Sequence, residues 1–410
     1  MPITRRSTLG AAATSALLPG LSRRAMAQPA AIRLGVLNDQ SGTYRDDTGP
    51  LSAICVRQAV EEFTKQHPEI RVEVLTADHQ NKPDVGAGIA RSWFDEGGVD
   101  VILDVPTSSV ALAVNTVCRE KNKVYLNSGA ATSDLTGVQC SPNTVHWTYD
   151  TYMLAKSTGM AMVKSGGDSW FFVTADYVFG QQLQRDTARF VQEAGGKVLG
   201  ARSYPFPDTM DFSSLLLQAQ SSGAKVLGLC NSGTDTVNCI KQAHEFGLTN
   251  SMKIVAMLMY DGNVRSVGLA DAQGLVMTES FYWDLNDRTR AFWERVRPKT
   301  PNQPPNMIQA GCYAAAWHYL KAAAAMGPAA AKADGKATVA HMKSMPTDDD
   351  CFGAGRIRED GRKIHPSYLL QVKTPAESKG PLDMLKLVAT TPADEAFRPM
   401  SEGGCSLARG

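Results

Sequence analysis

The chain has 410 residues, and its 42 Lys and Arg nearly balance its 41 Asp and Glu. A hydrophobic fraction of 43% with 20% charged residues is typical of a packed globular protein, and this length predicts two or three domains. Because the charge is balanced and no lysine-rich block occurs, we expect no nucleic-acid partner and no attraction to an anionic membrane surface.

The first 27 residues differ in composition from the rest of the chain. They hold four arginines, no lysine and no acidic residue, so 38 basic and 41 acidic residues remain for 28–410, a formal charge of −3. Arg5 and Arg6 precede a short apolar stretch, 9–21, and the small-residue sequence Ala25-Met26-Ala27. This layout predicts an export signal that is cleaved near Ala27, and therefore a mature protein outside the cytoplasm.

The export route stays open. The arginine pair resembles a twin-arginine signal, and an ordinary secretion signal that contains two arginines is the alternative. The apolar stretch 9–21 is shorter than the roughly 20 apolar residues that span a bilayer, so we expect no direct membrane insertion.

Strand and helix patterns alternate from residue 32 onward. Short β-rich runs predict strands, and apolar residues at helical spacing predict helices. The expected strands of a first series are 32–37, 71–77, 99–105 and 124–127, and its helices are 51–65, 85–95 and 109–121.

A second series of the same kind begins after Asp150. Its expected helices are 151–165, 180–194, 212–222 and 234–246, and its strands are 169–174, 197–204, 226–230 and 253–259. Strands joined by crossover helices form parallel sheets that are covered on both faces. The predicted fold class is therefore α/β, with two lobes that each have a parallel-sheet core.

Eight cysteines all follow the predicted signal. In an oxidising compartment an even number favours disulfides over a metal site. The preferred pairs are Cys118 with Cys140, Cys230 with Cys239, and Cys351 with Cys405. A buried free thiol is the alternative for each of them, and for Cys55 and Cys312 the two interpretations are equally supported.

Motifs for catalysis or cofactor binding do not occur. The chain has no GxSxG elbow and no GxxxxGK[ST] loop, and the glycine-rich stretch 86–91 lacks the third glycine of a dinucleotide fingerprint. The seven histidines are scattered, one per segment, which favours surface or packed histidines over a metal cluster. We expect no enzyme activity, no catalytic residue, no cofactor and no metal.

Small polar loops follow the first-series strands, at the carboxyl ends where open α/β sheets bind ligands. These loops are 41–44, 106–109 and 128–132. Backbone N–H groups and hydroxyls at a helix start bind anions, so Ser108, Ser109, Ala130 and Thr132 are candidates for holding a ligand carboxylate. N-capping by Ser108 and Ser109 is the equally supported alternative.

The corresponding loops of the second series are 176–180, 231–235 and 260–263, where aromatic and acidic residues dominate. Such side chains would close over the other end of a ligand by stacking, hydrogen bonding and charge. Trp147 and Tyr149 lie where the first series passes into the second. They would form either a wall of the cleft or buried core.

Several separated motifs occur in the order found in a known family. They are RLGVLNDQSG at 33–42, DLT at 134–136, DYVFG at 176–180 and KQAHEFGL at 241–248. From about residue 32 to 397 the chain resembles the branched-chain amino acid (Leu/Ile/Val) binding family of ABC transporters, which are type I periplasmic binding proteins.

The resemblance implies two Rossmann-like lobes joined by a three-crossover hinge, with a ligand in the cleft. It implies a first lobe of 28–148 plus 284–355 and a second lobe of 149–283 plus 356–410. Asp261 would take a ligand ammonium. If Tyr260 points inward instead, the ligand would be a carboxylate without an amine. The candidate ligand-binding residues are Tyr44, Ser108, Ser109, Ala130, Thr132, Tyr149, Tyr177, Asn231, Thr234, Tyr260 and Asp261.

The function that the resemblance implies is solute capture. We expect a monomeric extracytoplasmic protein that traps a small carboxylate, either an amino acid or an aromatic or aliphatic acid, and delivers it to an ABC permease of the inner membrane. The alternative is a periplasmic ligand sensor of the same fold that signals to a regulatory partner.

Overall fold

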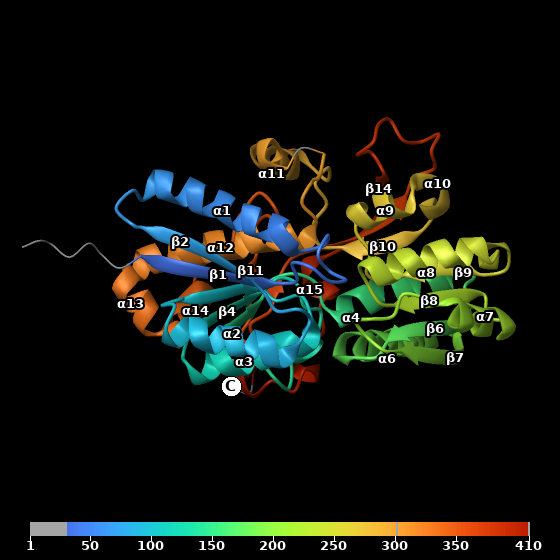
Figure 1. Ribbon diagram of the computed structural model, residues 1–410, viewed down its shortest axis with the longest axis horizontal. Helices are drawn as coiled ribbons and strands as arrows, with labels where there is room; N and C mark the ends of the chain where they lie inside the picture. The colour runs from blue at the N-terminus through green and yellow to red at the C-terminus, as the bar shows by residue number, and fades with distance from the viewer. Residues whose placement is uncertain (1–30, 301, 409–410) are drawn as a thin grey trace, which may run out of the picture.

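The computed structural model describes residues 31–300 and 302–408. The predicted export signal, 1–27, lies outside the described residues. Figure 1 shows two lobes side by side, each with a sheet between layers of helices.

The first lobe is built on five parallel strands in the order β2-β1-β3-β4-β5. They are β1 (Ile32–Asn38), β2 (Val72–Asp78), β3 (Val101–Asp104), β4 (Val124–Asn127) and β5 (Thr144–His146). Successive strand residues face opposite sides, so Val101 and Leu103 join one hydrophobic cluster and Ile102 joins another. Helices α1 (Gly49–Gln66) and α12 (Met307–Met326) cover one face, and α2 (Pro83–Asp95) and α3 (Ser108–Glu120) cover the other (Figure 1).

The second lobe contains four parallel strands in the order β7-β6-β8-β9. They are β6 (Ser169–Ala175), β7 (Lys197–Tyr204), β8 (Val226–Cys230) and β9 (Lys253–Ala256). The helices of this lobe are α6 (Val178–Glu193), α7 (Ser213–Ser221), α8 (Thr234–Glu245), α9 (Asp261–Val267) and α10 (Leu269–Ala272). The expected helix 151–165 is present as α4 (Thr151–Leu154), a π-helical turn η2 (Ala155–Gly159) and α5 (Met160–Lys164).

A small antiparallel sheet extends the second lobe beside β9. It consists of β10 (Val276–Glu279), β13 (Ser367–Val372) and β14 (Leu385–Thr391) in the order β10-β13-β14. The sequence patterns above do not indicate this sheet, because its strands come from two distant parts of the chain.

The chain passes between the lobes after β5, after β10 and after β12. Between the second and third passages α11 (Asp287–Val296), α12, α13 (Pro328–Ala333) and α14 (Gly335–Ser344) return to the first lobe. The hairpin of β11 (Arg356–Ile357) and β12 (Lys363–Ile364) follows, and the N–H of His146 donates to the Gly361 carbonyl, 2.9 Å away. The predicted fold class, two α/β lobes with parallel sheets, is confirmed.

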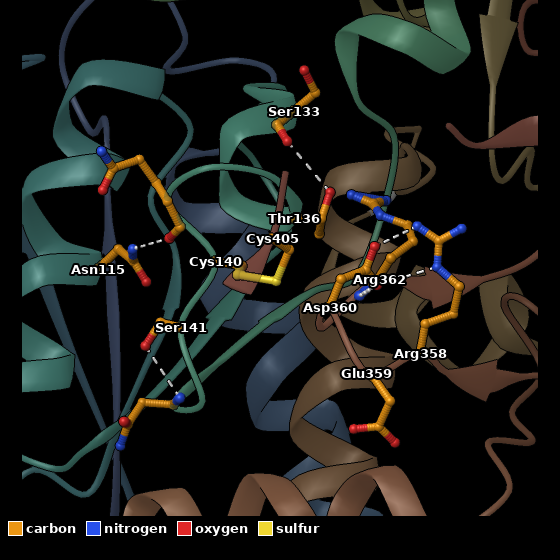
Figure 2. The surroundings of a disulfide bond; sticks show 12 residues. Asn115, Ser133, Thr136, Cys140, Ser141, Arg358, Glu359, Asp360, Arg362 and Cys405 are labelled. Atoms are coloured by element: carbon orange, nitrogen blue, oxygen red, sulfur yellow. Dashed lines mark hydrogen bonds and ion pairs between the residues drawn. A yellow bond between two sulfur atoms is a disulfide. The ribbon is translucent and has the colours of Figure 1, made fainter. Parts of the chain in front are cut away.

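The C-terminal segment returns from β14 to the first lobe. It includes the short helix α15 (Ala393–Ala396), and Cys405 forms a disulfide with Cys140, with 5.6 Å between their Cα atoms (Figure 2). Cys140 lies in the loop between β4 and β5, so a segment that the predicted boundaries give to the second lobe is covalently tied to the first. The side chain of Arg398 adds a hydrogen bond to the Ser133 carbonyl at 2.9 Å.

The three cysteine pairs predicted from the sequence are wrong. Cys118 lies on the buried face of α3 and Cys351 lies in the core under α1 and α12, so neither reaches its predicted partner. Cys239 contacts the Asn231 amide at 3.4 Å and is a free thiol, as is Cys230. The free, buried cysteines are Cys55, Cys118, Cys230, Cys239, Cys312 and Cys351.

Candidate ligand-binding site

A cavity lies between the two lobes, at the carboxyl ends of both parallel sheets, where the fold predicts a ligand site. From the first lobe and the first crossover it is lined by Tyr44, Asp47, Thr48, Pro106, Gly129, Ala131, Tyr149 and Ile308. From the second lobe it is lined by Tyr177, Phe179, Ser232, Leu258 and Tyr260. Both lobes therefore supply walls to one site.

Two pairs of tyrosines bridge the cavity. The hydroxyls of Tyr44 and Tyr177 are 2.6 Å apart, and the Tyr260 hydroxyl donates to that of Tyr149 at 3.0 Å. The Tyr149 hydroxyl in turn donates to the Gly129 carbonyl at 2.5 Å. Burial raises the pKa of all four phenols above the usual value, so the hydroxyls stay neutral. Because Tyr149 and Tyr260 already donate their protons in the closed form, only the Tyr44–Tyr177 pair has a proton left to donate to a ligand.

Local hydrogen bonds hold these tyrosines in place. The carboxylate of Asp39, just after β1, accepts the backbone N–H of Gly42 at 2.6 Å and that of Tyr44 at 2.9 Å, which folds the 39–44 loop. At the start of α9 the Asn263 side chain accepts the Tyr260 N–H at 3.0 Å. The loops that carry the site are thus fixed by their own polar residues.

The lobes are closed on each other. The Phe206 ring stacks on Tyr177 at 4.3 Å and on Tyr44 at 5.5 Å, and the N–H of Thr234 donates to the Thr43 carbonyl at 3.2 Å. The side chain of Asn263 reaches across to Asp47 at 2.9 Å. The cavity that remains is about 10 Å³, room for about one water molecule. A ligand can therefore enter only when the lobes open, and the closed lobes must make room for it.

The predicted carboxylate-binding residues of the first lobe lie beside the cavity and do not line it. Ser108 begins α3 and is buried, and its hydroxyl has no hydrogen-bond partner among the described residues. Ser109 is half-buried behind it. The Ala130 N–H already donates to the Asn127 side chain at 3.0 Å, and the Thr132 hydroxyl accepts from the Asp134 N–H at 3.3 Å.

The capping alternative for Ser108 and Ser109 is not observed. Thr107 is the N-cap residue of α3, and no side chain caps the helix. The neighbours Pro106, Gly129 and Ala131 are the residues of these loops that reach the cavity.

In the second lobe, the loop after β8 contributes Ser232 instead of its two predicted residues. The Asn231 side chain accepts a hydrogen bond from Thr236 at 2.7 Å, inside the lobe, and Thr234 is exposed at the start of α8. At the next loop Tyr260 lines the cavity, whereas Asp261 is buried behind it.

Asp47 is the charged residue that the sequence reasoning missed. It lies three residues after Tyr44 in the same loop, and α12 fixes it, because the side chains of Asn306 and Gln309 donate to its carbonyl at 2.8 and 3.0 Å. The cavity lining contains no Lys, Arg or His. Burial raises the pKa of the Asp47 carboxyl to about 7, and the hydrogen bond from Asn263 opposes this shift.

This carboxyl predicts that closing of the ligand-free protein depends on pH. An open cleft would return the Asp47 pKa toward its ordinary value of about 3.9, so the closed form binds more protons between about pH 4 and 7. Closing is therefore favoured at pH 5 and disfavoured at pH 8. The charged or titratable groups near this carboxyl are those of Asp39, Asp46, Asp261, Glu279, Tyr149 and Tyr260.

Small-angle X-ray scattering of ligand-free protein checks this prediction. We expect a smaller radius of gyration at pH 5 than at pH 8, and a smaller difference between the two pH values for Asp47→Asn. Equal radii for the unchanged protein at the two pH values would contradict it.

Comparison with known proteins identifies the fold family. Residues 31–381 match the family model described as periplasmic binding protein. The chain belongs to the periplasmic binding protein family. Because the members of this family bind substrates for ABC transporters, this binding protein is not an enzyme, and the resemblance seen in the sequence is confirmed.

Two solved structures are similar in both sequence and fold. This binding protein is 45% identical to a periplasmic binding protein from Burkholderia mallei, with 92% of this chain and 99% of that one covered and a TM-score of 0.88. It is 35% identical to a branched chain amino acid ABC transporter periplasmic ligand-binding protein from Burkholderia xenovorans LB400, with 92% and 100% covered and a TM-score of 0.80.

More distant relatives match less of the chain or share the fold alone. A Leu/Ile/Val-binding protein homolog 4 from Brucella abortus is 23% identical over 244 residues, and the match spans only 58% of that protein and 57% of this one. A solute binding protein from R. palustris in complex with benzoate is 19% identical, with 92% of this chain and all of that chain covered and a TM-score of 0.77.

Within 31–300 and 302–408, no helix combines the length and apolarity needed to cross a membrane.

Proposed function

We propose that this binding protein is exported to the periplasm, where it acts as a monomer, closes around a small carboxylate ligand and delivers it to an ABC permease of the inner membrane. The observation that carries the proposal is the closed cleft, in which Tyr44 and Asp47 of one lobe meet Tyr177 and Asn263 of the other. A ligand that fills the space between such groups would hold the lobes together.

The start of α3 supports a carboxylate. The helix has 13 residues and its first N–H groups have no intrahelical partner, which makes its N-terminus attractive to an anion. The unpartnered Ser108 hydroxyl lies at the same end, and Pro106 and Gly129 bring both loops to the cavity wall. Since no Lys or Arg lines the cavity, backbone N–H groups and hydroxyls would hold the carboxylate.

The rest of the cavity suits an apolar ligand body. Phe179, Leu258 and Ile308 line it together with the tyrosine rings. Two of the similar structures are a branched chain amino acid ABC transporter ligand-binding protein and a benzoate complex. Branched-chain amino acids and benzoate are both small carboxylates with an apolar body.

Thermal unfolding of the purified exported protein tests the proposal. We expect amino acids or small aliphatic and aromatic acids to stabilise it by about 2.7 kcal/mol at 100 times the Kd. Sugars and primary amides of similar size are the controls, and stabilisation by these alone would contradict a carboxylate ligand.

Uptake in the source bacterium separates transport from sensing. If the protein serves a permease, deletion of its gene abolishes uptake of the ligand that the thermal screen identifies. Unchanged uptake with a lost transcriptional or chemotactic response would instead support the sensor.

A further inference from the structure

The segment after β14, residues 392–408, makes a fourth connection between the lobes, and we call it the strap. It leaves the antiparallel sheet of the second lobe, passes over the β11–β12 hairpin and ends on the first lobe at Cys405. Figure 1 shows its short helix α15 between the two lobes. The fold thus has one connection more than the three-crossover hinge that the sequence resemblance implies.

Polar contacts fix the strap to both lobes within a few residues. On the second lobe, Lys156 of the η2 turn donates to the carbonyl of Glu395 at 2.6 Å. On the first lobe, Arg398 donates to the carbonyl of Ser133 at 2.9 Å. Glu395 and Arg398 are three positions apart, and an extended chain spans at most about 3.6 Å per residue. While both contacts hold, the backbone of the strap therefore lets these two positions separate by no more than about 11 Å.

Between these two points, Phe397 of the strap packs on the hinge. The Arg362 guanidinium lies 4.5 Å from the centre of the Phe397 ring, the centre of the His365 ring lies 4.9 Å from it, and all three side chains are buried. Arg362 donates to the Thr148 carbonyl, and a ring nitrogen of His365 lies 3.2 Å from the Trp147 carbonyl oxygen. Phe397 therefore covers the residues through which the third crossover holds the first.

A buried positive charge at the hinge strengthens this contact. Arg362 is fully buried and pairs with Asp150 at 3.7 Å, and its Nε and Nη2 atoms have no hydrogen-bond partner among the described residues. The face of an aromatic ring attracts a cation that is removed from water. The strap is therefore bound to the hinge by an attraction between Phe397 and Arg362 in addition to apolar contact.

The far end of the strap is held covalently, because Cys405 is bonded to Cys140 of the first lobe (Figure 2). Without the Arg398 contact, the free length would run over ten positions from Glu395 to Cys405, about 35 Å of extended chain. The Arg398 contact therefore keeps the tethered segment short, and the disulfide prevents the strap from leaving the first lobe.

We propose that the strap limits how far the lobes open, so that the ligand-free protein adopts only a narrow range of open forms. A narrower range lowers the conformational entropy that is lost when the lobes close on a ligand. The strap therefore favours closing, although it does not line the cavity. This inference goes beyond the proposed function and does not depend on the chemical class of the ligand.

Distances between the lobes of the ligand-free protein test the inference at pH 8, where closing is disfavoured. Spin labels on noncanonical amino acids at Arg57 of α1 and Gln220 of α7, both exposed, report these distances by double electron–electron resonance. Such labels leave the cysteines unmodified. The variants are Cys140→Ser/Cys405→Ser, which releases the end of the strap, and Arg398→Gln, which lengthens the tethered segment and keeps the disulfide.

We expect both variants to broaden the distance distribution, with distances that extend at least about 5 Å beyond those of the wild-type protein, because the tethered chain becomes longer or free. Lys386→Gln is the matched control. It removes an ion pair of β14 with Glu377, 2.5 Å long, and no contact of the strap, so it should leave the distribution as it is in the wild-type protein.

Circular dichroism establishes that each variant is folded. A wild-type distribution in folded Cys140→Ser/Cys405→Ser would overturn the inference, because the strap would then only cover the surface of the first lobe. If the double variant does not fold, Arg398→Gln decides in its place, and a wild-type distribution in that variant would overturn the inference equally.

Discussion

Replacing Gly233 with alanine is expected to hold the lobes apart and to weaken ligand binding at least about 100-fold. Gly233 precedes α8 with φ +66° and ψ −141°, a conformation that residues with a side chain rarely adopt. A Cβ atom at this position would overlap the Thr43 carbonyl oxygen and lie 3.0 Å from the Tyr44 ring, both in the opposite lobe. The substitution therefore obstructs the closed form and leaves the open form free of this clash.

Gly223→Ala is the matched control. This glycine also has a positive φ, +68°, but a Cβ there would have no heavy atom within 4 Å. Both variants lose some stability to backbone strain, about 1 kcal/mol or more, and only Gly233→Ala should lose affinity. Titration calorimetry and scattering of the ligand-bound protein measure the two effects. Normal affinity in folded Gly233→Ala would contradict the closed form as the binding form.

Removing the Cys140–Cys405 disulfide is expected to lower the free energy of unfolding by about 4 kcal/mol. The two residues are 265 positions apart, so the bond removes much of the freedom of the unfolded chain. Urea unfolding of Cys140→Ser/Cys405→Ser, compared with the unchanged protein without reductant, measures the loss.

Dithiothreitol provides the internal control for this experiment. We expect the reductant to lower the free energy of unfolding of the wild-type protein to that of the double variant. The free energy of unfolding of the double variant itself should not change. Because the six other cysteines are buried thiols, no second bond should respond. An unchanged urea midpoint of the original protein after complete reduction would show that the bond adds no stability.

The sequence predicts the two parallel sheets because the signal is local. Runs such as 169–174 and 226–230 are short and rich in apolar and β-branched residues. The segments between such runs have apolar residues at helical spacing, which predicts the helices. The rule that ligands bind at the carboxyl ends of strands then points to the right loops. Four of the candidate residues, Tyr44, Tyr149, Tyr177 and Tyr260, line the cavity because their loops leave those strand ends directly.

The rest of the site depends on information that local patterns do not hold. Ile308 reaches the cavity from α12, far from the other lining residues in sequence, and the backbone carbonyl of Asp47 is held by Asn306 and Gln309 at the start of that helix. Thr132 and Ala130 have the right chemistry, yet their polar groups are used within their own loop. Only the folded structure shows which polar groups of a loop form hydrogen bonds within that loop and which remain free for a ligand.

Cysteine pairing fails for the same reason. The predicted pairs include two of short sequence separation, whereas the observed bond joins a first-lobe loop to the far end of the chain. Nothing near Cys140 in sequence signals that the segment after β14 crosses back to the first lobe.

The Cys140–Cys405 bond also makes most of the molecule a covalent ring. All strands of the second lobe, from β6 to β9, and the antiparallel strands β10, β13 and β14 lie between the two bonded residues. A protease that cuts a surface loop of that lobe therefore opens the ring without releasing a fragment. The cut protein should migrate as a single covalent species until it is reduced, so the second lobe is retained after a break in its backbone.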